Sequence, residues 1–249
     1  IFLIAKKSFG GNSAVVSSAL FLFSYSVMFN SVFSFGIDLA MMLIMIGMYF
    51  MTNRDNHLIA GLFFGIAPLT RLLSLIPIAI IIAAAVFAAK RGGKNNDKRK
   101  GAKLLLGFLV VLLMQVPLVL FFGADYFNQV YVFHFLKGFG GVSNFREYTD
   151  IIRYNWMVFT APVLLMLAKD KKPAGFYALI SISYLLFLMT LKTIFGFYFL
   201  IVFPFLALVG GYSIVRLYER LEKKIIKRIF LSVLALGFLW NLGADVRFL

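Results

Sequence analysis

The chain has 249 residues, of which 62% are hydrophobic and 14% are charged. A soluble globular domain is typically about 45–50% apolar and about 25% charged, so this composition argues against one and favours a membrane protein. The formal net charge is +15 and cysteine is absent, which excludes disulfides, thiolate metal sites and cysteine nucleophiles.

Apolar runs begin at the N-terminus and recur along the whole chain. The chain starts at Ile1 with neither a methionine nor a signal-peptide pattern, and residues 1–5 resemble the end of an apolar helix. We therefore expect an N-terminal truncation within an apolar helix; the family resemblance given below implies that a helix and a first outer loop lie upstream. Runs long enough for transmembrane helices follow. We predict about nine membrane segments, at residues 12–32, 36–52, 57–70, 72–89, 104–122, 151–167, 175–191, 193–215 and 229–244. The predicted fold is an all-α, polytopic transmembrane helical bundle that forms a single domain over residues 1–249.

Residues 57–89 are compatible with one long helix or with two helices. Pro68 removes a helical hydrogen bond and Arg71 would be costly in the middle of a membrane, so both favour a break near these residues. The distribution of charge supports two helices, because lysine and arginine concentrate in cytoplasmic loops. With two helices, the cytoplasmic side receives 19 of the 25 basic residues, and with one helix this asymmetry weakens.

Two strongly basic loops are predicted on the cytoplasmic side, residues 90–103 (KRGGKNNDKRKGAK) and residues 216–228 (RLYERLEKKIIKR). Contact with an anionic inner leaflet explains them, since each Lys or Arg contributes about 1 kcal/mol near such a surface. We therefore expect membrane lipids, and no nucleic acid, as partners of these segments. The second segment also has the pattern of a short amphipathic helix at the interface.

The longest predicted outer loop is residues 123–150, GADYFNQVYVFHFLKGFGGVSNFREYTD. A connection of this length is often functional or disordered, and its aromatic content argues against simple disorder. One interpretation is a helix that lies in the membrane interface, where aromatic belts form. The other is a ligand-binding loop, because charged residues and a histidine are interleaved with the aromatic residues.

Two charged residues lie at the predicted outer ends of helices. Asp38 either caps a helix N-terminus, where the helix dipole favours negative charge, or is a carboxylate in a pocket that opens outward. Arg71 lies at the helix break in APLTRLLSLIP. It either contacts a phosphate, for which a guanidinium group is well suited, or forms a structural pair with Asp38 or a backbone carbonyl.

The other candidate binding residues are His134, Lys137, Arg146 and Tyr198. His134 is the only histidine on the outer side and is either structural or catalytic. Lys137 and Arg146, together with Arg153, would attract anions to the outer mouth. Tyr198 either points its hydroxyl into the same cavity or is an ordinary interfacial aromatic residue. The HExxH, P-loop, GxSxG and Rossmann motifs are all absent.

Three stretches of the chain carry a family resemblance. NSAVVSSALFLFSYSVMFNSVFSFGIDLAMMLIMIGMYFM has the form helix, short outer loop, aspartate and helix, with Asp38 as the aspartate. HLIAGLFFGIAPLTRLLSLIPIAII is similar to the pattern AGLxxGLAxLTK…LP, with Arg71 where lysine is commoner. FGFYFLIVFPFLALVGG is similar to RYLLPLLPFLALL, with Tyr198 and Pro204 matching and Phe197 in place of the usual Arg or His. In order and sidedness, these stretches resemble the GT-C superfamily of membrane glycosyltransferases, in the style of protein O-mannosyltransferases and bacterial lipid A aminoarabinose transferases (glycosyltransferase family 39).

The segment YVFHFLKG also looks like the family's YHxxR element, with His134 and Lys137 in those places. The resemblance implies transfer of a sugar from a polyprenyl-phosphate donor to an acceptor glycan, lipid or protein, on the extracytoplasmic face of the cell membrane. It implies that a carboxylate base upstream of this chain activates the acceptor and that Asp38 is an accessory residue. The departing phosphate would be stabilised by cations, namely Arg71 together with Lys137 or Arg146. Relatives differ over a divalent metal, so the resemblance leaves a metal cofactor open, and no metal ligands are predicted.

Two other classes of protein stay open on the sequence. A multi-pass transporter or lipid flippase would bind its substrate near the bilayer midplane through broken helices and buried charges, whereas here the charges cluster at the outer rim. A structural or assembly subunit of a membrane complex is the third class, and the long polar and aromatic outer loop argues mildly against it.

Overall fold

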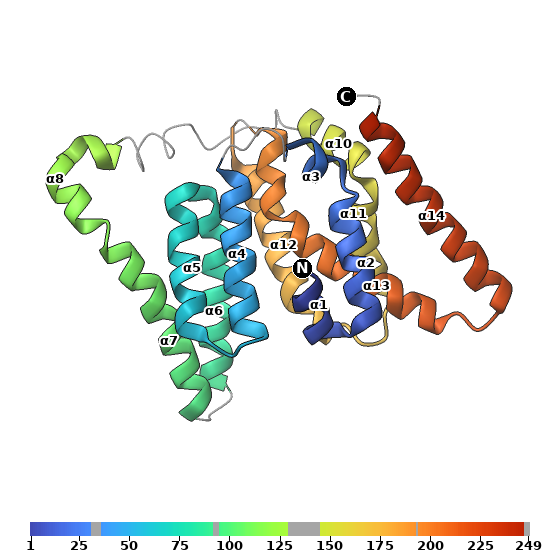
Figure 1. The fold of residues 1–249 in the computed structure, drawn as a ribbon, viewed down its shortest axis with the longest axis horizontal. Coiled ribbons are helices and arrows are strands. Elements are labelled where there is room, and N and C mark those ends of the chain that lie inside the picture. The colour runs from blue at the N-terminus through green and yellow to red at the C-terminus, as the bar shows by residue number, and fades with distance from the viewer. Residues whose placement is uncertain (31–35, 92–94, 129–144, 193, 247–249) are drawn as a thin grey trace. The chain divides into compact units, whose positions relative to one another are not determined.

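The computed structural model describes residues 1–30, 36–91, 95–128, 145–192 and 194–246, and the elements in these ranges are all helices (Figure 1). The all-α prediction is therefore confirmed. The chain divides into two compact units. Unit 1 comprises Ile1–Ser34, Phe145–Ile182 and Phe195–Leu249, and unit 2 comprises Phe35–Asn144 and Ser183–Ile194.

Unit 2 is built around α5, which packs against α4 on one side and α7 on another (Figure 1). Its helices are α4 (Ile37–Thr52), α5 (His57–Thr70), the short 3-10 helix η1 (Leu72–Ser74), α6 (Leu75–Arg91), α7 (Asn95–Leu113) and α8 (Val116–Phe127). Asn56 begins α5, because its Oδ1 accepts a hydrogen bond from the backbone N–H of Ile59 at 3.2 Å. This bond satisfies one of the donors that a helix N-terminus leaves without a partner.

Glycine lets α5 and α7 approach closely. A Cβ at Gly61 would collide with the carbonyl oxygen of Leu104, and a Cβ at Gly107 would collide with the carbonyl oxygen of Leu58. At Gly65, one turn after Gly61, a Cβ would lie 2.6 Å from a side chain of α7. Small residues four apart are the pattern by which helices pack closely in membranes. The contacts also show that α5 and α7 run in the same direction. α6, which lies between them in the sequence, runs the opposite way.

The predicted helix break near Arg71 is confirmed. α5 contains Pro68 and ends at Thr70, and the backbone of Arg71 is extended (φ −155°, ψ 114°). η1 and α6 then continue the chain. Residues 57–89 are therefore two helices, as the charge distribution favoured.

Unit 1 is built around α13 (Phe203–Arg220), whose residues from Phe203 to Ile214 are all buried. Its other helices are α1 (Phe2–Phe9), α2 (Gly11–Leu22), α3 (Tyr25–Asn30), α10 (Phe145–Tyr154), α11 (Trp156–Thr160), η4 (Ala161–Leu167), η5 (Gly196–Ile201) and α14 (Lys224–Val246). α12 (Lys172–Thr190) begins in unit 1 and ends in unit 2. α2 crosses α13 where Gly211 meets Ser17, and a Cβ at Gly211 would lie 2.6 Å from the Ser17 nitrogen.

Buried Asn155 ties α3 to the start of α11. Its Oδ1 accepts a hydrogen bond from the Ser26 N–H at 2.9 Å. Its Nδ2 donates to the Ser26 hydroxyl at 2.8 Å and to the Ile151 carbonyl at 2.9 Å. A buried amide is tolerated only when it is hydrogen-bonded in this way, so Asn155 fixes the position of α3.

The predicted count of about nine membrane segments was wrong. In the described ranges, one helix, Lys172–Thr190, is long and apolar enough to cross a membrane, and a second candidate is the pair Asn96–Leu113 and Val116–Asp125, which is bent by 45°. A straight span needs about 20 residues, and five other apolar segments of the described chain are shorter than that. They form helices of 10–17 residues, at Gly11–Leu22, Ile37–Thr52, His57–Thr70, Leu72–Ala88 and Trp156–Leu167.

The two basic segments predicted as loops are largely helical. In the first, α6 continues to Arg91 and α7 begins at Asn95. In the second, α13 continues to Arg220 and α14 begins at Lys224. Most of the charge therefore lies on the ends of helices and not in the connections between them.

Candidate functional site

The polar end of unit 2 brings Asp38 and Arg71 to the same region. Asp38 lies in the first turn of α4, and Arg71 directly follows the last residue of α5. Gly36, two residues before Asp38, lies close to the end of α5: a Cβ at Gly36 would be 3.4 Å from the Thr70 carbonyl oxygen and 4.0 Å from Nε of Arg71. Gly36 is also left-handed (φ 72°), a conformation that glycine adopts without steric cost. Asp38 and Arg71 are both half-buried.

The opposite end of unit 2 carries an ion-pair cluster. Lys100 Nζ lies 2.8 Å from Asp55 Oδ1, and His57 Nε2 lies 3.1 Å from the same oxygen. The hydrogen bond from Lys100 is the largest cause that lowers the pKa of Asp55. Because α4 runs from Asp38 towards Asp55, the basic segment 90–103 and the Asp38–Arg71 region lie at opposite ends of this unit.

Arg146 and Tyr198 belong to unit 1. Arg146 is exposed near the start of α10, and its Nε lies 3.9 Å from Asp150 Oδ2. Tyr198 is half-buried in η5, with its ring perpendicular to that of Phe197 at 4.9 Å. α10 and η5 are in contact, so Arg146 and Tyr198 come from neighbouring elements.

Tyr148 joins these two elements and was not predicted as a site residue. Its ring packs edge-on against that of Phe199 in η5, with 4.9 Å between the centroids. Burial raises the pKa of Tyr148 to about 12, so its hydroxyl stays protonated at neutral pH. Its place in an aromatic loop was visible in the sequence, but the pairing with η5, about 50 residues later, was not.

The predicted set of site residues is divided between the units. Asp38 and Arg71 are together in unit 2, and Arg146 and Tyr198 lie in unit 1. His134 and Lys137, with most of the aromatic outer loop, lie outside the described residues. Within the described ranges, no group of three or more His, Cys, Asp or Glu residues could hold a metal ion.

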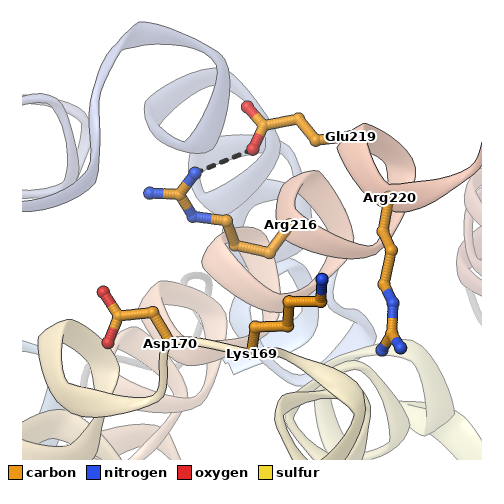
Figure 2. Close-up of a pocket in the computed structure, with 5 residues that line it drawn as sticks. All are labelled: Lys169, Asp170, Arg216, Glu219 and Arg220. Atoms are coloured by element: carbon orange, nitrogen blue, oxygen red, sulfur yellow. Dashed lines mark hydrogen bonds and ion pairs between the residues drawn. The ribbon is translucent and has the colours of Figure 1, made fainter.

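A further polar region lies at the end of unit 1 where α13 finishes. Five charged residues line a surface hollow of about 370 Å³ there, namely Lys169, Asp170, Arg216, Glu219 and Arg220 (Figure 2). They come from two segments more than 40 residues apart. The sequence predicted a cytoplasmic position for residues 216–228 but gave no sign that they form a hollow with Lys169 and Asp170.

The arrangement in unit 2 supports recognition of an anion at one end of a helix group. A guanidinium at a break in the backbone can bind a phosphate, and a carboxylate at the same end of the helix group can orient the guanidinium or a sugar hydroxyl. Comparisons with models of protein families, with curated proteins and with solved structures found no match for this chain.

Proposed function

We propose that the chain is part of a membrane glycosyltransferase that moves a sugar from a polyprenyl-phosphate donor to an acceptor on the extracytoplasmic face. The observation that carries the proposal is the placement of Asp38 and Arg71 together at the end of unit 2 that is opposite the Asp55–Lys100 cluster. A phosphate-binding cation at the membrane face away from the basic segments is what a lipid-phosphate leaving group requires. The resemblance of the sequence to the GT-C superfamily points to the same chemistry.

Exposed apolar stripes support a membrane location. On α12 and on α14, large apolar side chains recur on one face at helical spacing, and each is more than half exposed. They are Leu179, Ile182, Leu186 and Met189 on α12, and Ile229, Val233, Leu236 and Trp240 on α14. Soluble monomers rarely expose contiguous apolar surface of this kind, whereas lipid chains would cover it. We therefore propose a multi-pass protein of the cell membrane whose shorter helices also lie within the bilayer.

The proposed reaction assigns a role to each group. A carboxylate base takes the proton of the acceptor hydroxyl or amine. The acceptor attacks the anomeric carbon, and the bond from that carbon to the phosphate oxygen breaks with its electron pair on the phosphate. Arg71 stabilises this departing charge, and Asp38 orients the cation or the sugar. A divalent metal stays open in this proposal.

A transporter or lipid flippase is the second candidate, because two apolar helix pairs are broken. The chain is extended at Arg71 between α5 and η1, and the pair Asn96–Leu113 and Val116–Asp125 is bent by 45°. Broken helices with charges are typical of transport sites near the bilayer midplane. Arg71, however, follows the end of a helix group, which favours chemistry at a membrane face.

Replacing Arg71 with alanine in the full-length protein tests the proposal. We expect sugar transfer in proteoliposomes, from polyprenyl-phosphate-linked hexoses or pentoses, to fall by at least about tenfold, because the leaving phosphate loses a charged donor. Arg54→Ala is the matched control, since Arg54 is an exposed arginine between α4 and α5, at the end of unit 2 opposite Arg71 and with no role in the proposed transfer, and it should leave transfer unchanged. Unchanged turnover in Arg71→Ala, at an unaltered melting temperature, would remove Arg71 from the mechanism.

A further inference from the structure

The hollow at the basic end of unit 1 has no role in the proposed sugar transfer. It lies between the residues that follow η4 and the last turn of α13 (Figure 2). Two hydrogen bonds to the backbone hold these segments together. The Tyr212 hydroxyl donates to the Asp170 carbonyl at 2.7 Å, and Arg220 Nη1 donates to the Leu167 carbonyl at 2.9 Å. These two bonds connect the segments that line the hollow.

The three cations of the hollow differ in what they already bind. Arg216 Nη1 pairs with Glu219 Oε2 at 2.8 Å, and its guanidinium lies 5.3 Å from the centre of the Tyr212 ring. Arg220 uses Nη1 on the backbone, which leaves most of the five N–H donors of a guanidinium. No carboxylate in the described part of the chain forms an ion pair with Lys169. In Figure 2 its ammonium group points between the Arg216 and Arg220 side chains.

The surroundings of the hollow are strongly basic. The Ser8 hydroxyl lies 3.0 Å from the Tyr177 hydroxyl, and the ring of Phe9 lies 4.9 Å from that of Tyr212. These contacts bring the end of α1 to the start of α12 and the end of α13. Residues 6–7, 169–172 and 216–228 thus meet at one end of unit 1, and they hold 11 basic and 3 acidic residues. Such an excess of one sign raises the local concentration of anions.

We propose that this hollow binds a phosphate group, with Lys169 and Arg220 as its principal donors. Phosphate oxygens accept several charge-assisted hydrogen bonds at once, which suits an ammonium and a guanidinium that line the same hollow. Two sources share this chemistry, the headgroup of an anionic phospholipid in the inner leaflet and free phosphate. Glu219 competes with the phosphate for Arg216. The proposed transfer reaction does not use the residues of this hollow.

Native mass spectrometry of the purified full-length protein in detergent tests the lipid source, with phosphatidylglycerol as the probe. Titration calorimetry with inorganic phosphate tests the soluble source. For whichever probe binds, we expect Lys169→Gln and Arg220→Gln each to weaken its affinity about fivefold. Lys171→Gln removes the same charge two residues away from Lys169, outside the hollow, and should change affinity by less than about twofold. Glu219→Gln should tighten binding, because it releases Arg216.

The proposal is supported if either probe binds and the affinities of the variants follow this order. The probe that binds identifies the source of the phosphate. The proposal is overturned if neither probe binds, or if Lys171→Gln weakens binding as much as Lys169→Gln. Misfolding would not increase the affinity for the probe. A gain of affinity in Glu219→Gln therefore tests the proposal even if Lys169→Gln or Arg220→Gln is unstable. Sugar transfer is not measured here, so a negative result leaves the proposed function standing.

Discussion

At the scale of single residues, Asp55 connects the turn between α4 and α5 to the basic start of α7. The hydrogen bond from Lys100, with a further one from His57, lowers the pKa of Asp55 below 3.8. A carboxylate with a lowered pKa stabilises the fold above its unfolded-state pKa and loses this contribution as the pH falls through the folded-state value. The stabilisation from this pair is therefore present above about pH 4 and is lost below it.

We expect Asp55→Asn to remove this pH-dependent contribution. Because the Asp55 side chain is 63% exposed, the loss at pH 7 should be less than about 1 kcal/mol. Melting temperatures in detergent between pH 6 and pH 3 measure it, with Asp97→Asn on α7 as the control for the loss of one negative charge. An equal loss for Asp97→Asn would show that net charge, and not the Lys100 pair, is responsible.

Asn155 provides a second test on a single residue. In Asn155→Ala, the Ser26 N–H loses its acceptor while it stays buried, which costs about 1–3 kcal/mol. We expect a lower melting temperature and faster proteolysis near α3. Ser26→Ala is the milder control, since it removes the 2.8 Å hydroxyl contact but keeps the bond from the backbone N–H. A melting temperature for Asn155→Ala equal to that of Ser26→Ala would contradict the role given to this amide.

At the scale of elements, the close contact of α5 and α7 makes the sharpest prediction. Gly61→Ala places a methyl group against the Leu104 carbonyl, and we expect it to destabilise the protein by about 1–3 kcal/mol. Gly175→Ala is the matched control, because a Cβ at this helical position meets nothing within 4 Å. It should be neutral or stabilising, since alanine is the better helix former. Denaturant titrations that show equal effects for both variants would contradict this packing.

The helix break at Arg71 could be predicted from sequence because its causes, a proline and an arginine in an apolar run, are local. The lengths of the helices could not. The expected segment 12–32 is interrupted after Leu22, and the expected segment 151–167 changes from α-helix to 3-10 helix at Ala161. Hydropathy averages over such interruptions, so it predicted more spans than the structure has helices of sufficient length.

The candidate site was predictable only in part, for a similar reason. Asp38 and Arg71 stand out singly, as rare charges beside apolar helices. Their proximity depends on the approach of Gly36 to the end of α5, which no local pattern encodes. The hollow around Lys169 and Arg220 is likewise formed by segments that meet only in the folded unit.

At the scale of the whole molecule, the central claim is that the basic ends of the helices face the cytosol and the polar ends face outward. In unit 1, Thr149 on α10 and Lys171 after η4 are both exposed and are separated by α11 and η4. The chain has no cysteine, so single-cysteine variants at these positions carry the only reactive thiol in it.

Labelling of Thr149→Cys and Lys171→Cys with a membrane-impermeant maleimide tests this claim most directly. In intact cells that express the full-length protein, we expect Thr149→Cys to react and Lys171→Cys to react only after the membrane is opened. Reaction of both variants in intact cells, or of neither until the membrane is opened, would place the two ends on one side. That result would contradict both the membrane arrangement and the transferase proposed from it.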